Sequence, residues 1–342
     1  MPANLDFVKL PSMPLRELYA DLPAPSSPAA PFHQVMYIRE QVATATVEAF
    51  APHLVVVDHA PAGLFRELAR SLETLREREP RPTFVVLMRD ITFSPDQTRE
   101  IWQTDGIYPL LDNLYDRILV YGERDLYDPV REYGMSEQAA LKTRFCGYLA
   151  PVPPRRPPDA IRAALGAEGR PLIAVSVGGG ADGGPLLRAY LEGLRDERNR
   201  DVVSYVVVGP LLPAADVATV VALSEGLPNL TLVSLDPDYL AVARAADVLV
   251  SMGGYNSMTE AAYLGKRAIV APRVPGSEEQ VIRADRFAQR GLVTNLPPDE
   301  LSAARLWELI RAELDRHQPP SRALSFDGVQ AIVNELVDAI AE

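Results

Sequence analysis

A short apolar run, Val248–Val250, is followed by Gly253-Gly254 and then by Asn256-Ser257, which stand where a helix should begin. The run has the composition of a buried parallel strand. A glycine pair lets backbone N–H groups approach a ligand closely, and a helix N-terminus offers unpaired donors with a partial positive charge. The pattern therefore predicts an anion-binding turn that suits a diphosphate. An ordinary glycine turn between a strand and a helix is the alternative.

Carboxylate and amide groups follow this turn at positions that suit hydroxyl groups. We expect Glu260 on the first turn of the helix, where it can accept hydrogen bonds from a ribose diol beside a diphosphate. Further on, Pro272-Arg273 ends another strand, and Glu278-Glu279-Gln280 opens another helix with polar groups that suit sugar hydroxyls. Phosphate, ribose and hexose each have an expected partner, in order along the chain.

The segment Asp247–Leu292 closely resembles the donor-binding half of two-domain (GT-B) glycosyltransferases, above all family 28, which includes the peptidoglycan-precursor N-acetylglucosaminyltransferase. It is also similar to the signature of UDP-glycosyltransferases, whose Gly-aromatic-Asn-Ser stretch matches Gly254–Ser257. The resemblance implies that Glu260 binds the ribose and that Glu279-Gln280 reads the sugar. Met252 departs from that signature, because many UDP-glycosyltransferases carry a His there that contacts phosphate.

A second glycine-rich sequence, Ser176–Gly184, also lies between a strand and a helix. It satisfies the dinucleotide fingerprint literally, but that site needs an acidic residue at the end of the next strand. The next strand ends in Val208-Gly209-Pro210, so we expect no nicotinamide cofactor and no other cofactor. In family 28 a loop at this place touches the donor diphosphate or the acceptor, so the resemblance assigns Gly179 and Gly180 to the donor site. A structural turn is the alternative.

The pair Asp58-His59 ends an apolar run, and ligands of open α/β sheets gather outside the carboxyl ends of strands. The His59 imidazole could remove the proton of an acceptor hydroxyl, with Asp58 orienting it. Asp58 could instead support a His from a first glycine-rich loop, as in UDP-glycosyltransferases. A capping Asp and a surface His are the plain alternative. Arg89-Asp90, at the end of the next strand, is a second pair, better explained by buried ion pairing.

No spacing of carboxylates or histidines predicts a metal site. Asp236-Pro237-Asp238 matches the Asp-x-Asp motif of the other large glycosyltransferase class, but it lies in a second-half loop without the rest of that pattern. In the resembled family this loop packs against the nucleotide base, and Asp238 is also suited to cap a helix. We therefore expect a metal-independent reaction.

The 342 residues are 47% hydrophobic and 23% charged, with a net charge of −12. This is an ordinary globular composition, and the negative charge argues against nucleic acid as a partner. Cys146 is the sole cysteine, so no intrachain disulfide can form. No apolar run is long enough for a transmembrane segment and the first residues do not read as a signal peptide, so we expect a cytoplasmic protein.

Strand-like runs alternate with helical patterns, which predicts an α/β fold of two Rossmann-like domains. We expect an acceptor-side domain over residues 1–150, a Pro-rich linker over 151–169, a donor-binding domain with five strands over 170–324, and a C-terminal helix over 325–342 that crosses back to the first domain. Strands are expected at the following places: Leu5–Leu10, Leu54–Asp58, Phe84–Asp90, Arg117–Tyr121, Arg144–Gly147, Pro171–Val177, Ser204–Gly209, Leu230–Leu235, Val248–Ser251 and Ala268–Pro272.

The resembled family opens with a strand and a glycine-rich loop that have no counterpart before Leu5–Leu10. We therefore expect the first domain to lack its N-terminal strands, which either lie upstream or are supplied by a partner chain. The segment Pro11–Pro31 is expected to be an exposed loop.

Together these features predict an inverting glycosyltransferase that moves a sugar from a nucleotide diphosphate, with a UDP-sugar as the expected donor and a hydroxyl group of unknown identity as the acceptor. Two alternatives stay open. One is a non-catalytic or partner-dependent nucleotide-sugar-binding subunit, and the other is a sugar-nucleotide 2-epimerase of the same architecture.

Overall fold

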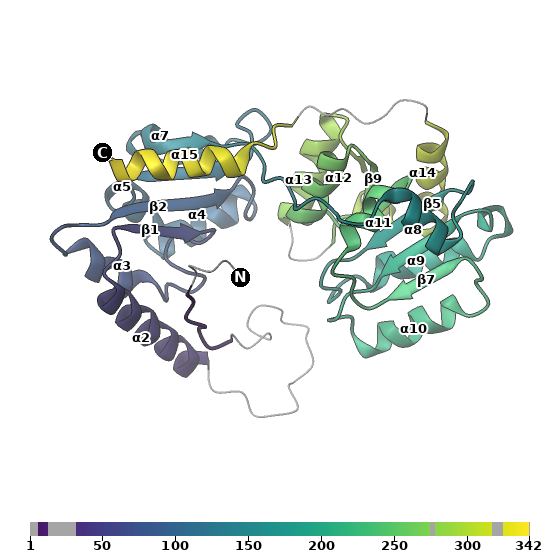
Figure 1. The fold of residues 1–342 in the computed structure, drawn as a ribbon, viewed down its shortest axis with the longest axis horizontal. Helices are drawn as coiled ribbons and strands as arrows, with labels where there is room; N and C mark the ends of the chain where they lie inside the picture. The colour runs from purple at the N-terminus through teal and green to yellow at the C-terminus, as the bar shows by residue number, and fades with distance from the viewer. Residues whose placement is uncertain (1–5, 13–31, 274–277, 317–323, 342) are drawn as a thin grey trace. The chain divides into compact units, whose positions relative to one another are not determined.

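The computed structural model describes residues 6–12, 32–273, 278–316 and 324–341. They form two compact units (Figure 1). The first unit combines Met1–Asp90, Pro95–Cys146 and Val329–Glu342, and the second combines Ile91–Ser94 and Gly147–Gly328. Each unit is an α/β sandwich around a parallel sheet, as the alternation of strand-like and helical patterns predicts.

The first unit has a four-stranded parallel sheet in the order β1-β2-β3-β4. The strands are β1 (Leu54–Asp58), β2 (Thr83–Arg89), β3 (Arg117–Tyr121) and β4 (Thr143–Phe145). Strands β2 and β3 are nearly continuous apolar runs whose side chains are mostly buried, as expected for parallel strands that are covered on both faces. Strand β1 lies at the edge of the sheet, and its Val56 side chain is 40% exposed.

The helices of this unit are α2 (Phe32–Phe50), α3 (Ala69–Arg76), α4 (Pro95–Thr104), α5 (Ile107–Asn113), α6 (Pro129–Glu132), α7 (Glu137–Lys142) and most of α15 (Gly328–Ala341). The last helix is held to the sheet by the Thr83 hydroxyl, which donates to the Ala339 carbonyl at 3.3 Å. The expected strand Leu5–Leu10 is wrong for its described part, because residues 6–10 are not in a strand and are mostly exposed. Most of the expected loop Pro11–Pro31 lies outside the described residues.

The second unit has a six-stranded parallel sheet in the order β10-β9-β8-β5-β6-β7. The strands are β5 (Leu172–Ser176), β6 (Val203–Val207), β7 (Leu230–Val233), β8 (Val248–Ser251), β9 (Arg267–Val270) and β10 (Thr294–Asn295). The five expected strands are present, and the sequence missed β10, which has only two residues and therefore no detectable periodicity.

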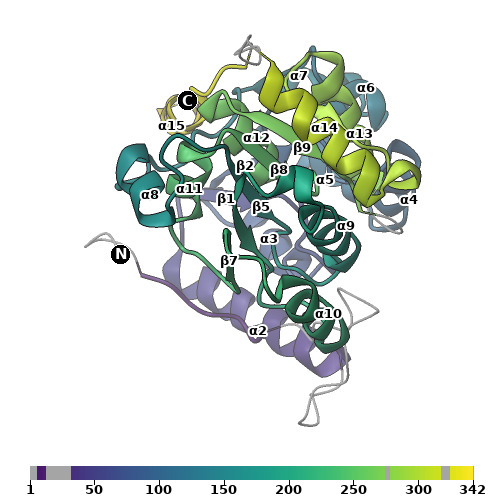
Figure 2. The same cartoon turned by 90° about the vertical axis from the view of Figure 1, so that its right-hand side faces the viewer.

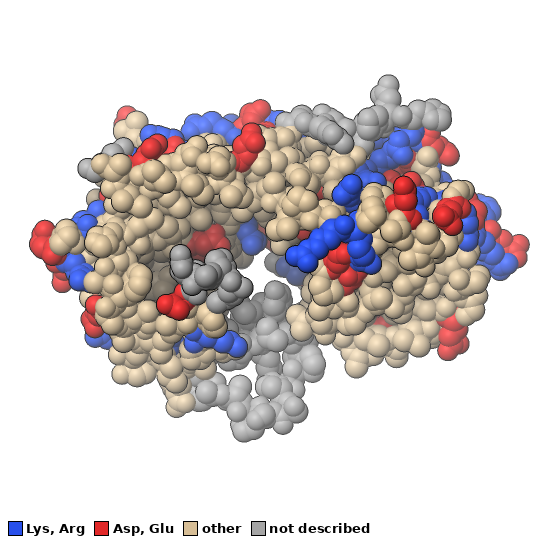
Figure 3. Space-filling model, in the orientation of Figure 1, with Lys and Arg blue, Asp and Glu red and all other residues tan. Residues whose placement is uncertain are grey.

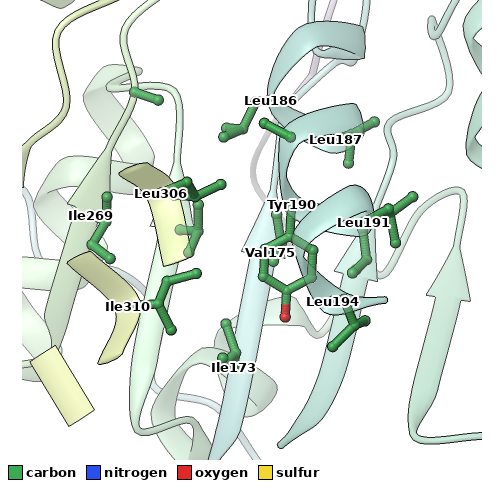
Figure 4. Close-up of a cluster of buried hydrophobic side chains, with 14 of the residues drawn as sticks. Ile173, Val175, Leu186, Leu187, Tyr190, Leu191, Leu194, Ile269, Leu306 and Ile310 are labelled. Atoms are coloured by element: carbon green, nitrogen blue, oxygen red, sulfur yellow. The ribbon is translucent and has the colours of Figure 1, made fainter. Parts of the chain in front are cut away.

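Helices cover both faces of this sheet (Figure 2). They are α8 (Pro158–Leu165), α9 (Gly184–Leu194), α10 (Ala214–Ser224), α11 (Tyr239–Ala245), α12 (Tyr255–Leu264), α13 (Glu278–Gln289) and α14 (Ala303–Asp315), with short 3-10 turns η1 (Glu197–Asn199) and η2 (Pro298–Glu300). On one face α9 lays Leu187, Tyr190 and Leu191 against Ile173 and the helix α14 (Figure 4). On the other face the alanine-rich α11 packs between α8 and α12.

The strand order places a topological switch in the second unit. From β5 the chain proceeds to β6 and β7 on one side, and then returns to β8 on the other side. Loops that leave β5 and β8 therefore diverge at the same sheet edge, and ligands of open α/β sheets bind in such crevices. Both glycine-rich sequences lie there, since one follows β5 and the other follows β8.

Candidate functional site

The turn after β8 is shaped by Gly253, whose φ of +82° favours glycine. A Cβ atom at this position would lie 3.0 Å from Val270 Cγ1 and 3.4 Å from the Gln280 carbonyl oxygen. Gly254 then adopts an extended conformation as the N-cap of α12. A Cβ atom at Gly254 would meet no described atom within 4 Å, so the N-terminus of α12 faces open space on this side.

The first turn of α12 places Asn256 and Ser257 at its second and third positions, where backbone N–H groups have no acceptor within the helix. Asn256 is exposed and Ser257 is half-buried, so both side chains can reach a ligand beside the N–H groups. The structure thus brings together Gly253, Gly254, Asn256 and Ser257 in one turn. Such a helix end attracts anions through its N–H donors and its dipole.

Arg283 holds this turn and was missed by sequence reasoning. It lies in the middle of α13 and is only 3% exposed. Its Nη1 donates to the Gly253 carbonyl at 3.1 Å, and its Nη2 donates to the Ile91 carbonyl at 2.8 Å. A buried arginine in a predicted helix is a weak sequence signal, because most helical arginines face solvent. Here its planar fork joins two carbonyls from segments far apart in the chain.

Glu260 lies in the second turn of α12, not in the first turn as expected, because the helix already begins at Tyr255. Its carboxylate is half-buried, and burial raises the pKa of Glu260 above the ordinary value. The negative charge of Glu260 contributes, after burial, to the raised pKa of Tyr239 at the start of α11. The Glu260 carboxylate is therefore close enough to Tyr239 for its charge to act on that hydroxyl.

That segment carries a network of its own. The Tyr205 hydroxyl donates to Asp236 Oδ2 at 2.8 Å, and the Asp238 backbone N–H donates to Asp236 Oδ1 at 2.9 Å. Asp238 occupies the N-cap position of α11 but makes no capping hydrogen bond with its side chain, so the expected capping contact is wrong. Its carboxylate pairs with Arg156 of the Pro-rich segment at 2.5 Å instead.

The expected sugar-reading residues begin α13, as the sequence predicts. Gln280 is buried, and its Oε1 accepts the Arg273 backbone N–H at 3.3 Å. The Arg273 guanidinium contacts Glu279 Oε1 at 3.9 Å and donates to Asp182 Oδ2 at 2.6 Å. Burial raises the pKa of Glu279 above its ordinary value. The charges of Arg283 and Arg273 lower this pKa, and the charge of Asp182 raises it. Glu279 therefore belongs to a charged group that joins the β9 loop to the glycine-rich loop.

The two glycines assigned to the donor site differ in their surroundings. Gly180 is buried with a φ of +92°, and a Cβ atom there would lie 2.4 Å from the Val208 carbonyl oxygen. Gly179 is exposed, and its carbonyl accepts the Leu211 N–H at 2.8 Å. Gly180 is thus needed for close packing against the β6 loop, whereas Gly179 is exposed in the loop that leaves β5.

Asp58 and His59 belong to the first unit, and the other expected site residues belong to the second. Asp58 ends β1, and its Oδ1 accepts the Tyr121 hydroxyl of β3 at 3.1 Å. Burial and then the Asp58 charge raise the pKa of Tyr121 to about 12, while a hydrogen bond with Arg89 of β2 opposes the shift. The last residues of three adjacent strands therefore form one network at the carboxyl edge of the sheet.

His59 has a φ of +68°, a left-handed conformation that is unusual for a residue other than glycine. Its backbone N–H still donates to the Leu87 carbonyl at 2.8 Å, so the sheet ladder and the strained backbone coexist. Strain of this kind clusters at functional sites. A cavity of about 550 Å³, with mainly aliphatic walls from β1, α2 and α3, opens beside Asp58 and His59.

Among the described residues, no three His, Cys, Asp or Glu side chains gather in a way that could hold a metal ion. None of the described helices has the length and apolar character needed to cross a membrane. On the face drawn in Figure 3, most atoms belong to uncharged residues, and acidic and basic side chains are interspersed.

Comparison with known proteins finds a family whose domain is similar to the second half of the chain. Residues 174–334 match the model of the glycosyltransferase family 28 C-terminal domain. An uncharacterized glycosyltransferase of Methanopyrus kandleri is 28% identical over 189 residues, which are 54% of this chain and 51% of that protein. The chain thus spans about half the length of this curated relative.

Solved structures show the same fold at low identity. The calicheamicin glycosyltransferase CalG4 aligns with a TM-score of 0.60 at 18% identity, over 91% of this chain and 80% of that chain. A UDP-N-acetylglucosamine 2-epimerase from Listeria monocytogenes, described as putative, aligns at 0.63 and 13% identity, over 91% and 80%. MurG of Acinetobacter baumannii aligns at 0.52 and 14% identity, over 97% and 85%. The fold is therefore of the GT-B type, with two Rossmann-like units, as the sequence predicts.

Proposed function

We propose that this chain, which carries a glycosyltransferase family 28 C-terminal domain, transfers a sugar from a UDP-sugar to a hydroxyl acceptor with inversion at the anomeric carbon. The observation that carries the proposal is the open N-terminus of α12 at the switch point, with Glu260 in the second turn of the same helix and Glu279 at the start of α13. Each part of a nucleotide sugar then has a partner of suitable chemistry in the second unit.

In the proposed mechanism the diphosphate binds at Gly253, Gly254, Asn256 and Ser257, and Gly179 borders it from the glycine-rich loop. Glu260 accepts hydrogen bonds from the ribose hydroxyls. The acceptor hydroxyl loses its proton to His59, which Asp58 orients, and its oxygen forms a bond to the anomeric carbon. The bond from that carbon to the diphosphate oxygen breaks, and the electron pair leaves with the diphosphate, whose charge the α12 N–H groups stabilise.

A metal ion is not needed in this proposal, because fixed N–H donors take the role of neutralising the leaving group. Chelation of divalent ions by EDTA should then leave the transfer rate unchanged. Cytoplasmic location and a partner chain that completes the first unit stay predictions.

Substitution of Gly254 tests the diphosphate site directly. Its backbone angles of −61° and 149° are open to any residue, and an added side chain meets no described atom within 4 Å. Gly254→Val should therefore leave the thermal stability unchanged while its side chain obstructs the ligand. We expect calorimetry to show UDP affinity reduced by tenfold or more, with a smaller effect on uridine, which lacks phosphate. Equal UDP affinity in the wild type and in Gly254→Val would contradict the assignment.

The two alternative functions are separated by the products. Incubation with UDP-N-acetylglucosamine and no acceptor gives an epimerised sugar if the chain is a 2-epimerase, and this product is visible by NMR. UDP binding with neither transfer nor hydrolysis, at any acceptor tried, would favour a non-catalytic or partner-dependent binding subunit.

A further inference from the structure

A buried ion pair lies close to His59 in the first unit. Arg39 of α2 donates from Nη2 to Glu67 Oε1 at 2.7 Å, and the two side chains are only 13% and 4% exposed. Both residues line the cavity of about 550 Å³ that Asp58 and His59 also line. Replacement of a buried ion pair by apolar side chains is often neutral or stabilising, so stability alone does not explain a pair at this place.

His59 lies at the centre of a strained three-residue turn. The Ala60 N–H donates to the Asp58 carbonyl at 2.8 Å, and the φ of His59 is +68°. A hydrogen bond between residues i and i+2 around a positive φ defines the rarer type of γ-turn, which is strained. Such a conformation persists only where surrounding contacts hold it. The position of the imidazole therefore depends on the contacts that hold this turn.

Glu67 holds the chain that follows the turn. Its Oε2 accepts the Phe65 N–H at 2.9 Å, while its Oε1 is held by the ion pair. The carboxylate also lies against Gly63, where φ is +84° and an added Cβ atom would be 2.5 Å from Glu67 Oε2. The Gly63 N–H donates to the Ala60 carbonyl at 2.9 Å. Contacts therefore run from Glu67 to the residue directly after His59.

Two further contacts fix this arrangement in the unit. The Arg39 Nη1 donates to the Pro11 carbonyl at 2.7 Å, so the planar guanidinium is held at two points. The Tyr115 hydroxyl, from the segment before β3, donates to the Pro61 carbonyl at 2.5 Å. The loop between β1 and α3 is thus held by one hydroxyl and one carboxylate, and both of these side chains are buried.

We infer that Glu67, held by Arg39, is a positioning residue for His59, because the buried pair keeps the γ-turn in the conformation from which the imidazole reaches the acceptor hydroxyl. The inference rests on the proposed function, in which His59 takes the proton of that hydroxyl. A misplacement of about 1 Å can cost on the order of 100-fold in rate. Loss of the pair should therefore lower the turnover. It should leave donor binding unchanged, since the proposed donor site belongs to the second unit.

The same region of the unit offers a matched control pair. Arg70 of α3 contacts Glu40 of α2 at 3.6 Å, and the two side chains are 58% and 36% exposed. This exposed pair also joins α2 to the α3 region, but it makes no printed contact with the loop that carries His59. Arg70→Met thus removes the same type of charge as Arg39→Met without disturbing the turn.

NMR of the histidine ring protons detects the surroundings of His59 without any reaction. The spectrum of His59→Gln assigns its signal among the four histidines of the chain. Arg39→Met and Glu67→Ala should each shift or broaden the His59 signal, whereas the Arg70 control should leave it unchanged. An unchanged His59 signal in both variants would overturn the inference. Should Arg39→Met not fold, Arg39→Lys is measured in its place, because it keeps the charge but loses the planar fork.

Turnover is measured as UDP release from UDP-N-acetylglucosamine, with water as the acceptor. Arg39→Met and Glu67→Ala should lower kcat by about tenfold or more and change KM by less than about twofold. A loss confined to KM, or wild-type kcat in both variants, would overturn the inference. Wild-type kcat in His59→Gln, or a wild type without turnover, would instead count against the proposed function. The NMR comparison then still decides whether the pair holds His59.

Discussion

Replacement of Glu260 should weaken UDP binding and increase the stability of the fold at neutral pH. The carboxylate is half-buried in the second turn of α12, and burial raises its pKa. The folded state therefore binds the Glu260 proton more tightly than the unfolded state does. Ionisation of Glu260 therefore lowers the free energy of unfolding as the pH rises through the folded-state pKa. Below the unfolded-state pKa the carboxyl is protonated in both states, and this loss is absent. Glu260→Gln should raise the free energy of unfolding at neutral pH and leave it unchanged in acid.

The same substitution should weaken UDP binding. A hydrogen bond to a charged acceptor contributes about 1.5–3 kcal/mol, and a neutral one about 0.5–1.5 kcal/mol. Exchange of the carboxylate for an amide should thus cost roughly 1 kcal/mol, or about fivefold in affinity, and Glu260→Ala should cost tenfold or more. In the wild type, UDP affinity should fall on acidification at a higher pH than an ordinary Glu would cause, because the ribose binds the ionised form.

Urea unfolding at neutral and acidic pH measures the stability, and calorimetry measures UDP affinity. Glu192→Gln, on the exposed side of α9, is the matched control and should change neither quantity. UDP affinity that is the same in Glu260→Ala and the wild type would refute the ribose assignment. A loss of stability in Glu260→Gln at neutral pH would refute the reasoning from burial.

Three further substitutions test the supporting residues. Arg283→Met removes two hydrogen bonds to buried carbonyls, so urea unfolding should show a loss of about 2–4 kcal/mol and calorimetry a weaker UDP affinity; unchanged stability would contradict the role of these two bonds. Tyr121→Phe should lower the rate of UDP release during transfer without changing UDP affinity, and equal rates would contradict a role for the Asp58 network. His59→Gly relieves the strain of the left-handed backbone at this position. It should raise the melting temperature by a few degrees and lower the transfer rate. A lower melting temperature would contradict the presence of strain at His59.

The fold was predictable from the sequence because parallel strands that are buried on both faces have sequences that are short apolar runs. The run Val248–Ser251 was placed without error, and Arg117–Tyr121 likewise. The prediction failed where local pattern and tertiary context disagree. The expected strand Leu5–Leu10 is not a strand over its described residues, and β10 is too short to show a period.

The candidate site was predictable only as far as its local turn. The helix starts at Tyr255 and Glu278 follow from glycines and acidic residues nearby in the chain, so the turn that the sequence predicts to bind an anion was visible. The partners of Arg273 and Arg283 were not, because each reaches loops from distant parts of the sequence. Such ion pairs and carbonyl contacts depend on the strand order, which one sequence does not reveal.

The strand order also changes how a donor would lie. Along the chain the expected partners of phosphate, ribose and hexose follow one another. In the sheet the order differs. The residues expected to bind the hexose follow β9, the turn expected to bind the phosphate follows β8, and the Asp236–Tyr239 segment follows β7 at the other end of the sheet. The charge of Glu260 acts on Tyr239 at the start of α11, which follows β7, because α12 packs against α11. A nucleotide sugar in the proposed site therefore crosses the carboxyl edge from the β9 loop towards the β7 loop.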